Sequence, residues 1–192
     1  ADIQASDIQN KGNHGFTFTA KIFDQAIPVK LPQIGYCNIY NALAALATGH
    51  SLGITGKEMN LGLKNYQQIP QRNEQIHHEG MTLINDTYNA NPQSMREALK
   101  TLKEINTQGK RFFIIGDMLE LGPLSEPAHH ELGQEIARSN VDYLVTVGPL
   151  ASLAAESAKA NVRQQLKIEK FNTHDEAVNY LLRKVKKGDC LL

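Results

Sequence analysis

The chain of 192 residues carries 20 acidic and 20 basic side chains, is 41% hydrophobic, and contains two cysteines and no tryptophan. Balanced charge with this apolar content excludes a disordered chain, and the lack of a basic excess argues against a nucleic-acid partner. The longest apolar run, Ala42 to Ala47, is far shorter than the roughly 20 residues that cross a bilayer, so we expect no membrane insertion. The two cysteines lie far apart, which predicts a cytoplasmic protein without a disulfide scaffold.

The first 69 residues predict a hairpin followed by two helices. In chain order, the predicted elements are strands at 16–20 and 26–31 on either side of Asp24-Gln25, a helix over 38–48 and a second helix through residue 63. Thr55 and Glu58 have the spacing of a capping box at the start of the second helix. We expect a thin core here, because neither helix has a sheet large enough to cover.

From residue 70 the pattern changes to alternating strands and helices. The predicted strands are 81–86, 111–115, 143–147, 166–171 and 190–192, and the helices between them begin near the caps Asn91, Ser125 and Thr173 and near Pro149. Continuous apolar strands between amphipathic helices predict an α/β, Rossmann-like domain with a mostly parallel sheet. Ligands of such sheets bind beyond the carboxyl ends of the strands.

Both ends of the chain favour a piece of a longer protein. The chain begins with Ala1, and its last residues predict a strand that no turn terminates. We therefore expect residues 1–69 to be the end of one domain and residues 70–192 to be a second domain, truncated at its end. The alternative is a processed natural C-terminus.

A polar loop follows the strand predicted at 81–86. Asp86 has the chemistry to accept ribose hydroxyls, and the carboxamides of Asn89 and Asn91 can both donate to and accept from a peptide-like ligand. The alternative is structural: Asn91 caps the next helix and Asn89 fills a turn.

A second loop, residues 116–122, follows the strand predicted at 111–115. Gly116 would allow a close backbone approach or an unusual dihedral angle. Asp117 has the chemistry of a magnesium ligand or a phosphoryl acceptor, and is equally compatible with a turn residue. The glycines at 116 and 122 match neither a dinucleotide fingerprint nor a phosphate-binding loop.

Three further polar positions are candidates for ligand contacts. Asn38 and Asn41 share one face of a helix and could recognise an adenine edge, although Asn38 as N-cap and Asn41 as a solvated residue fit the same spacing. Arg72 stands where the pattern changes and could meet phosphate. The histidine pairs 77–78 and 129–130 are adjacent rather than one helical turn apart, so we expect no metal site.

Taken in order, these segments resemble the Mur ligases. The resemblance rests on 35–45 (Gly-Tyr-Cys-Asn-Ile-Tyr-Asn-Ala-Leu-Ala-Ala), Arg72, 85–95 (Asn-Asp-Thr-Tyr-Asn-Ala-Asn-Pro-Gln-Ser-Met), and 116–122 (Gly-Asp-Met-Leu-Glu-Leu-Gly) with Ser125 and His129. It implies that residues 1–69 correspond to the last part of the family's central ATP-binding domain, and residues 70–192 to its C-terminal domain.

The resemblance also implies an activity. Within the family it points to the branch that spends ATP, through an acyl phosphate, to add D-alanyl-D-alanine to UDP-N-acetylmuramoyl-tripeptide in peptidoglycan precursor synthesis. The implied cofactors are ATP and Mg²⁺, with the magnesium ligands outside this chain. The implied contacts are adenine at Asn38 and Asn41, ribose at Asp86, phosphate at Arg72, and the incoming dipeptide near Tyr88, Asn89 and Asn91, while residues 116–122 would shape the cleft wall.

The chain also departs from the family pattern. Cys37 stands where the family usually has histidine, and Gln71 stands where glycine usually precedes the arginine. The phosphate-binding loop with its lysine is missing from these residues, so we expect the chain alone to be inactive. The alternatives are a related ligase for glutamate, diaminopimelate, lysine or folylpolyglutamate, and a non-catalytic module that binds a nucleotide or a peptide.

Overall fold

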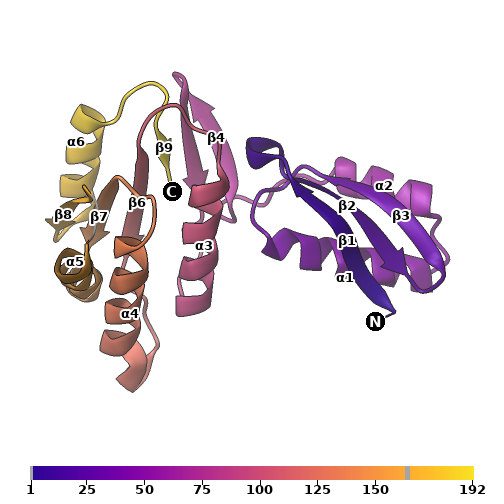
Figure 1. Ribbon diagram of the computed structural model, residues 1–192, viewed down its shortest axis with the longest axis horizontal. Coiled ribbons are helices and arrows are strands. Elements are labelled where there is room, and N and C mark those ends of the chain that lie inside the picture. Colours follow the sequence, from indigo (N-terminus) through magenta and orange to yellow (C-terminus); the bar gives the residue numbers. More distant parts are fainter. Residues whose placement is uncertain (1, 163–164) are drawn as a thin grey trace. The chain divides into compact units, whose positions relative to one another are not determined.

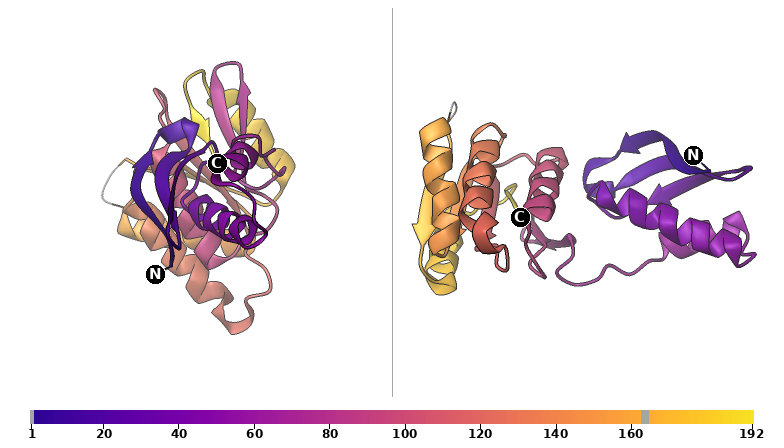
Figure 2. Two further views of the ribbon diagram at one scale, coloured as in Figure 1. Left: turned by 90° about the vertical axis from the view of Figure 1, so that its right-hand side faces the viewer. Right: turned by 90° about the horizontal axis from the view of Figure 1, so that it is seen from below.

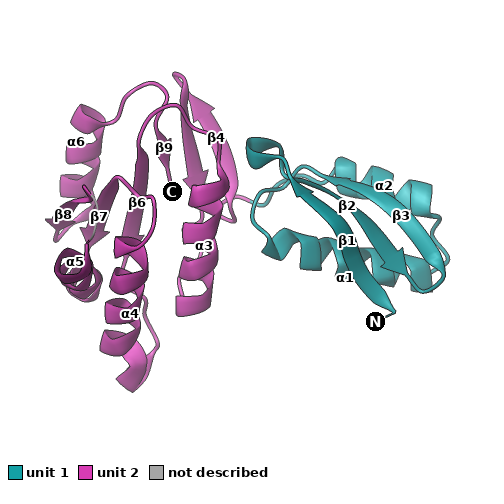
Figure 3. Cartoon of the chain, in the orientation of Figure 1, with its two compact units in different colours: residues 1–69 teal, residues 70–192 magenta. Residues whose placement is uncertain are grey.

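The chain folds into two compact units, Ala1–Ile69 and Pro70–Leu192 (Figure 3). The structure is a computed structural model that describes residues 2–162 and 165–192. Each unit has its own sheet, and the two sheets share no strand.

Unit 1 is a three-stranded antiparallel sheet with two helices (Figure 1). Its elements are β1 (Ile3–Asn10), β2 (Phe16–Ile22), β3 (Gln25–Leu31), α1 (Cys37–Ser51) and α2 (Gly56–Lys64), with one 3-10 turn at Gly12–His14. The predicted hairpin and both helices are confirmed, as is the capping box of Thr55 and Glu58. The turn lies one residue earlier than expected, since Gln25 already pairs with Ile22.

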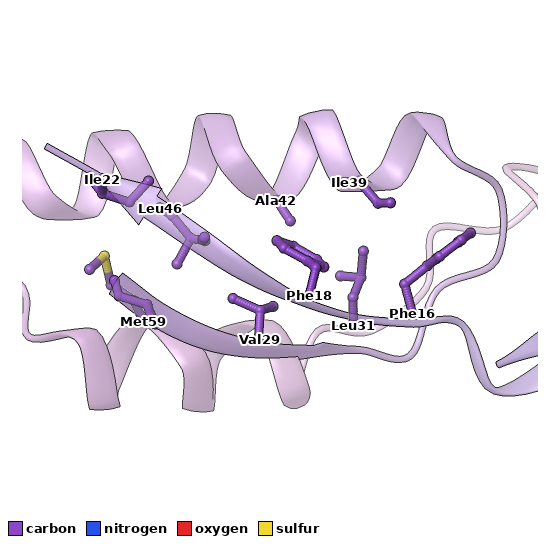
Figure 4. Close-up of a cluster of buried hydrophobic side chains, with 11 residues drawn as sticks. Phe16, Phe18, Ile22, Val29, Leu31, Ile39, Ala42, Leu46 and Met59 are labelled. Carbon is purple, nitrogen blue, oxygen red and sulfur yellow. The ribbon is translucent and has the colours of Figure 1, made fainter. Parts of the chain in front are cut away.

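The core of unit 1 is larger than the sequence suggested, so the expectation of a thin core is wrong. The missing element is β1, a largely exposed strand that extends the hairpin to three strands. The two helices lie on one side of this sheet, as the right-hand view of Figure 2 shows. Alternate residues of β2 and β3 point at the helices, and the buried cluster that they form with α1 and α2 is drawn in Figure 4. It comprises Phe16, Phe18, Ala20, Ile22, Ile27, Val29, Leu31, Ile39, Ala42, Leu46 and Met59.

Unit 2 is a six-stranded sheet in the order β4-β5-β9-β6-β7-β8 with four α-helices. Its elements are β4 (Glu74–His78), β5 (Met81–Asn85), α3 (Pro92–Glu104), β6 (Arg111–Gly116), a 3-10 turn (Gly122–Leu124), α4 (Ser125–Ala137), β7 (Tyr143–Val147), α5 (Pro149–Asn161), β8 (Lys167–Phe171), α6 (His174–Lys184) and β9 (Cys190–Leu191). All strand pairs are parallel except β4 with β5. The predicted α/β fold with a mostly parallel sheet is confirmed.

The strand order explains how the helices of unit 2 are placed. From β5 through β6 and β7 to β8 the chain moves in one direction across the sheet, and from β8 to β9 it turns back. Because parallel crossovers are right-handed, α3, α4 and α5 belong on one face and α6 on the other. In agreement, α6 buries Ala177 against Val145 and Val147 of β7, whereas α4 and α5 pack on each other.

The helix starts of unit 2 agree with the sequence for α3, α5 and α6 and differ for α4. Asn91 caps α3 and Thr173 caps α6, each in a capping box. Ser125, expected to cap α4, is instead the first residue of that helix. The 3-10 turn ahead of α4 delivers the chain in helical geometry, so Leu124 takes the N-cap position without a side-chain bond.

Strand β9 lies between β5 and β6, and the carboxylate of the residue before it forms hydrogen bonds that hold it there. The buried Asp189 accepts the backbone N–H of Lys110 at 2.7 Å and of Lys186 at 2.8 Å. These bonds join the segment that leads into β6 to the segment that leads into β9. They lie where the parallel strands β5, β9 and β6 begin, at the end of the sheet opposite to the one from which the polar loop after β5 emerges.

Candidate functional site

The carboxamides of Asn38 and Asn41 form one group at the start of α1. Asn38 Nδ2 donates to the carbonyl of Ile34 at 2.7 Å, and Asn41 Nδ2 donates to Asn38 Oδ1 at 3.1 Å. The shared helix face is therefore confirmed. Asn38 is not the N-cap, because α1 begins at Cys37 and Tyr36 takes that position. The two bonds set the orientation of the exposed Asn41 amide.

Two tyrosines beside this pair were not predicted from the sequence. Tyr36 and Tyr40 contact each other edge to face with ring centroids 6.1 Å apart, and Tyr36 packs in the same way on buried Phe16 at 6.0 Å. The Tyr40 side chain is 66% exposed. An exposed aromatic ring beside oriented carboxamides can stack on a flat heterocycle while the amides bond to its edge. The signal in the sequence was the i, i+4 spacing of the two rings.

Arg72 lies in a short turn at the start of unit 2, ahead of β4. The residues on either side of it have left-handed backbones, with φ of +62° at Gln71 and +50° at Asn73. Glycine adopts this conformation without a steric penalty, which accounts for the glycine that the family usually has before the arginine. In this chain, where Gln71 replaces that glycine, side-chain hydrogen-bond acceptors stabilise the turn.

Contacts with the loop after β5 stabilise this turn. Asp86 Oδ1 accepts the backbone N–H of Asn73 at 2.9 Å, and the backbone N–H of Tyr88 donates to the carbonyl of Gln71 at 3.2 Å. The Arg72 guanidinium carbon lies 3.9 Å from the centroid of the Tyr88 ring. Three predicted site residues, Arg72, Asp86 and Tyr88, are thus brought together across 16 positions of sequence.

The other two asparagines of the loop have structural bonds. Asn91 Oδ1 accepts the N–H of Ser94 at 2.9 Å, while Ser94 Oγ accepts the N–H of Asn91 at 3.0 Å. The alternative interpretation of Asn91 as a helix cap is confirmed. Asn89 Oδ1 accepts the N–H of Ala90 at 2.8 Å. Both residues stand beside Tyr88 in sequence, and their contact with a ligand stays a prediction.

The loop after β6 is bonded to the start of α5, which follows the neighbouring strand β7. Asp117 Oδ1 accepts the backbone N–H of Ala151 at 2.7 Å, so this carboxylate caps α5 from a neighbouring strand end. The close approach expected at Gly116 is found at Gly148, where φ is +106° and an added Cβ would lie 2.6 Å from the Asp117 carboxylate. A Cβ at Gly116 would meet only the Val147 carbonyl, at 4.0 Å.

His129 explains the spacing of the same loop. Its fully buried imidazole accepts the backbone N–H of Met118 at Nε2 (3.0 Å) and donates from Nδ1 to the carbonyl of Ser125 (2.7 Å). These partners assign the tautomer with hydrogen on Nδ1. The side chain therefore fixes the loop after β6 onto α4. Sequence reasoning noted His129 as part of a motif and missed this function.

In 2–162 and 165–192, no three or more His, Cys, Asp or Glu side chains gather where they could hold a metal ion. Within the same residues, none of the helices is both long enough and apolar enough to traverse a bilayer.

A family model described as "Mur ligase, glutamate ligase domain" matches residues 71–192. The chain belongs to the Mur ligase family. A similar relative, the UDP-N-acetylmuramoyl-tripeptide–D-alanyl-D-alanine ligase of Bacillus subtilis, is 31% identical over 192 residues, which is the whole of this chain and 41% of that protein. The predicted resemblance to Mur ligases, and within them to this branch, is confirmed.

Solved Mur ligase structures match the chain over its full length. A crystal structure of MurF from Acinetobacter baumannii has a TM-score of 0.86 and 31% identity, and MurF from Thermotoga maritima in complex with ADP has a TM-score of 0.81 and 25% identity. Each match covers all of this chain and 42% of the solved chain. The chain thus spans about two-fifths of the length of these relatives.

Proposed function

We propose that this chain is part of an ATP-dependent ligase that joins D-alanyl-D-alanine to UDP-N-acetylmuramoyl-tripeptide. The observation that carries the proposal is the match over all 192 residues to ligases with that printed name and to MurF structures. In this proposal, residues 1–69 are the end of the central ATP-binding domain and residues 70–192 are the C-terminal domain.

The proposed reaction has two steps. The tripeptide carboxylate attacks the γ-phosphorus of ATP, which forms an acyl phosphate and releases ADP. The amine of the dipeptide then attacks the acyl carbon, loses its proton, and expels phosphate from the tetrahedral intermediate. Both steps depend on positioning and on neutralising phosphate charge, so positively charged groups and directed N–H donors are the contribution expected of the protein.

We assign the nucleotide contacts from the chemistry of each side chain. Asn38 and Asn41 offer an oriented carboxamide, which can both donate to and accept from an adenine edge. Asp86 uses Oδ1 for the backbone of Asn73, and its carboxylate has further acceptor capacity for ribose hydroxyls. Arg72 supplies a guanidinium for the phosphates.

Tyr88, Asn89 and Asn91 are proposed to lie near the incoming dipeptide. The support is their position in the loop beyond the carboxyl end of β5, where ligands of parallel sheets bind. The amide group of Asn91 retains its Nδ2 donors beyond the cap bond to Ser94, which uses only Oδ1.

We propose that Mg²⁺ accompanies ATP and that its ligands belong to a part of the ligase outside this chain. The described residues hold no cluster suited to a metal ion, so they do not fit a magnesium site of their own, and we derive no step through it. A cytoplasmic location is proposed on the ATP requirement and on the two cysteines, Cys37 and Cys190, which form no disulfide with each other.

The test is a ligation assay on the complete protein that carries this chain. We expect phosphate release that needs ATP, the UDP-linked tripeptide and D-alanyl-D-alanine together, with the amide product seen by mass spectrometry. The 192-residue chain alone should release none. Faster ligation of glutamate, diaminopimelate or lysine would favour a related ligase, and nucleotide binding without any ligation would favour a non-catalytic module.

A further inference from the structure

Arg72 is held by a backbone turn that is unfavourable by itself. Both neighbours, Gln71 and Asn73, are non-glycine residues in the left-handed region. Such residues persist only where the surroundings enforce them, and they concentrate at ligand-binding positions. Contacts from other parts of unit 2 must therefore hold the turn in this conformation.

Two carboxylates bind the backbone on either side of Arg72. Glu74 Oε2 accepts the N–H of Gln71 at 3.0 Å and is itself held by Asn85 Nδ2 at 3.2 Å. Asp86 Oδ1 accepts the N–H of Asn73 at 2.9 Å. Glu74 lies in β4, and Asp86 directly follows the last residue of β5. The antiparallel pair of strands therefore sets the path of the backbone through Arg72.

The side chain of Arg72 is held by a third contact, with Tyr88. The guanidinium carbon lies at stacking distance, 3.9 Å, from the ring centroid, and the Tyr88 N–H donates to the Gln71 carbonyl, so the residue that carries the ring is bonded to the turn. A stacked guanidinium keeps its N–H donors for an anion. Among the described residues, no carboxylate forms an ion pair with Arg72.

We propose that Tyr88 is a positioning residue that holds the Arg72 guanidinium ready for nucleotide phosphates. We further propose that Asp86 links the two ends of the nucleotide, because the carboxylate assigned to the ribose also fixes the turn that carries the arginine. This inference rests on the proposed function. It gives Tyr88 a role through Arg72, which differs from direct contact with the dipeptide and is separable from it.

The test is a double-mutant cycle in the complete ligase. The variants are Tyr88→Leu, Tyr88→Phe, Arg72→Ala and Arg72→Ala with Tyr88→Leu, with Tyr66→Leu as a control at another exposed tyrosine. From the usual strength of a cation–π contact at an exposed site we expect Tyr88→Leu to lower kcat/KM for ATP about two- to fivefold. Tyr88→Phe, which keeps the ring, should lose less activity than Tyr88→Leu, and Tyr66→Leu should stay within about twofold of the parent protein.

The cycle separates positioning from a structural role. If Tyr88 acts through Arg72, adding Tyr88→Leu to Arg72→Ala causes no further loss of kcat/KM for ATP. Additive losses, or a rise confined to KM for the dipeptide, would overturn the inference.

A second measurement keeps the inference testable if the parent protein does not ligate. That result would count against the proposed function only. The same cycle is then run on ATP affinity by calorimetry, where the expected signature is again a Tyr88→Leu loss that vanishes in the Arg72→Ala background. Equal ATP affinity of the parent and Tyr88→Leu proteins would refute the positioning role.

Discussion

The sharpest structural prediction concerns two adjacent histidines of α4. His129 is fully buried and accepts the Met118 N–H, whereas its neighbour His130 is exposed. His129→Ala should strongly destabilise unit 2, and His130→Ala should change its stability by less than about 0.5 kcal/mol. The pair is a matched control, since both substitutions remove the same side chain from the same helix.

The expected loss follows from two costs. Without the imidazole, the Met118 N–H is left buried without an acceptor, which costs about 1–3 kcal/mol. Truncation also leaves a cavity where the ring was, for which about 2 kcal/mol is typical of buried side chains of this size. Together these give a loss of about 4 kcal/mol in the free energy of unfolding. With a urea m-value of about 2 kcal/mol/M, the midpoint falls by about 2 M.

The assay reports on unit 2 alone. Cys190 is buried in β9, so its reaction with a thiol reagent at rising urea follows the opening of this unit. Cys37, in unit 1, is replaced by serine throughout. If the labelling midpoints of His129→Ala and His130→Ala agree within about 0.3 M, corresponding to about 0.6 kcal/mol at that m-value, the assigned role of His129 is wrong.

Three further outcomes are expected. An added Cβ at Gly133 would lie 2.2 Å from the Ala154 carbonyl, so Gly133→Ala should lower the stability of unit 2 by about 2 kcal/mol in thermal unfolding. Gly62 has open space around it, so Gly62→Ala should raise the stability of unit 1 by about 0.5 kcal/mol in the same assay. Asp189→Ala orphans two backbone N–H groups and should cost about 3 kcal/mol in urea unfolding, whereas an unchanged midpoint would contradict the fastening of β9. Burial raises the pKa of the Cys190 thiol from 9.0 to about 11, so unit 2 should lose stability as pH rises between these values, and Cys190→Ala should flatten that slope.

The elements that local sequence predicted share a property. Thr55 with Glu58 and Thr173 with Glu176 mark helix starts through contacts that span three residues, so the sequence alone contains both partners. Asn91 followed directly by Pro92 marks the start of α3 in the same local way. The buried strand β7 was recognised because both of its faces are covered and nearly all of its positions are apolar.

The missed elements are polar edge strands. β1 and β4 each lie at the edge of a sheet and are largely exposed, so neither has an apolar run to reveal it. A local signal did exist for β4. Glu79 and Gly80 join β4 to β5 with positive φ at both positions, which is the geometry of a two-residue hairpin turn.

By itself, the sequence determined the alternating α/β pattern of unit 2 and which polar residues are candidates for ligand contacts. Those conclusions depend on residue type and short spacing, which are local. Only the tertiary structure decided how these residues are used: Asp117 caps α5, His129 holds Met118, and Asp86 and Tyr88 hold the turn of Arg72. Each of these contacts joins residues 11 to 34 positions apart, and such partners are set by strand order and by the loops at strand ends.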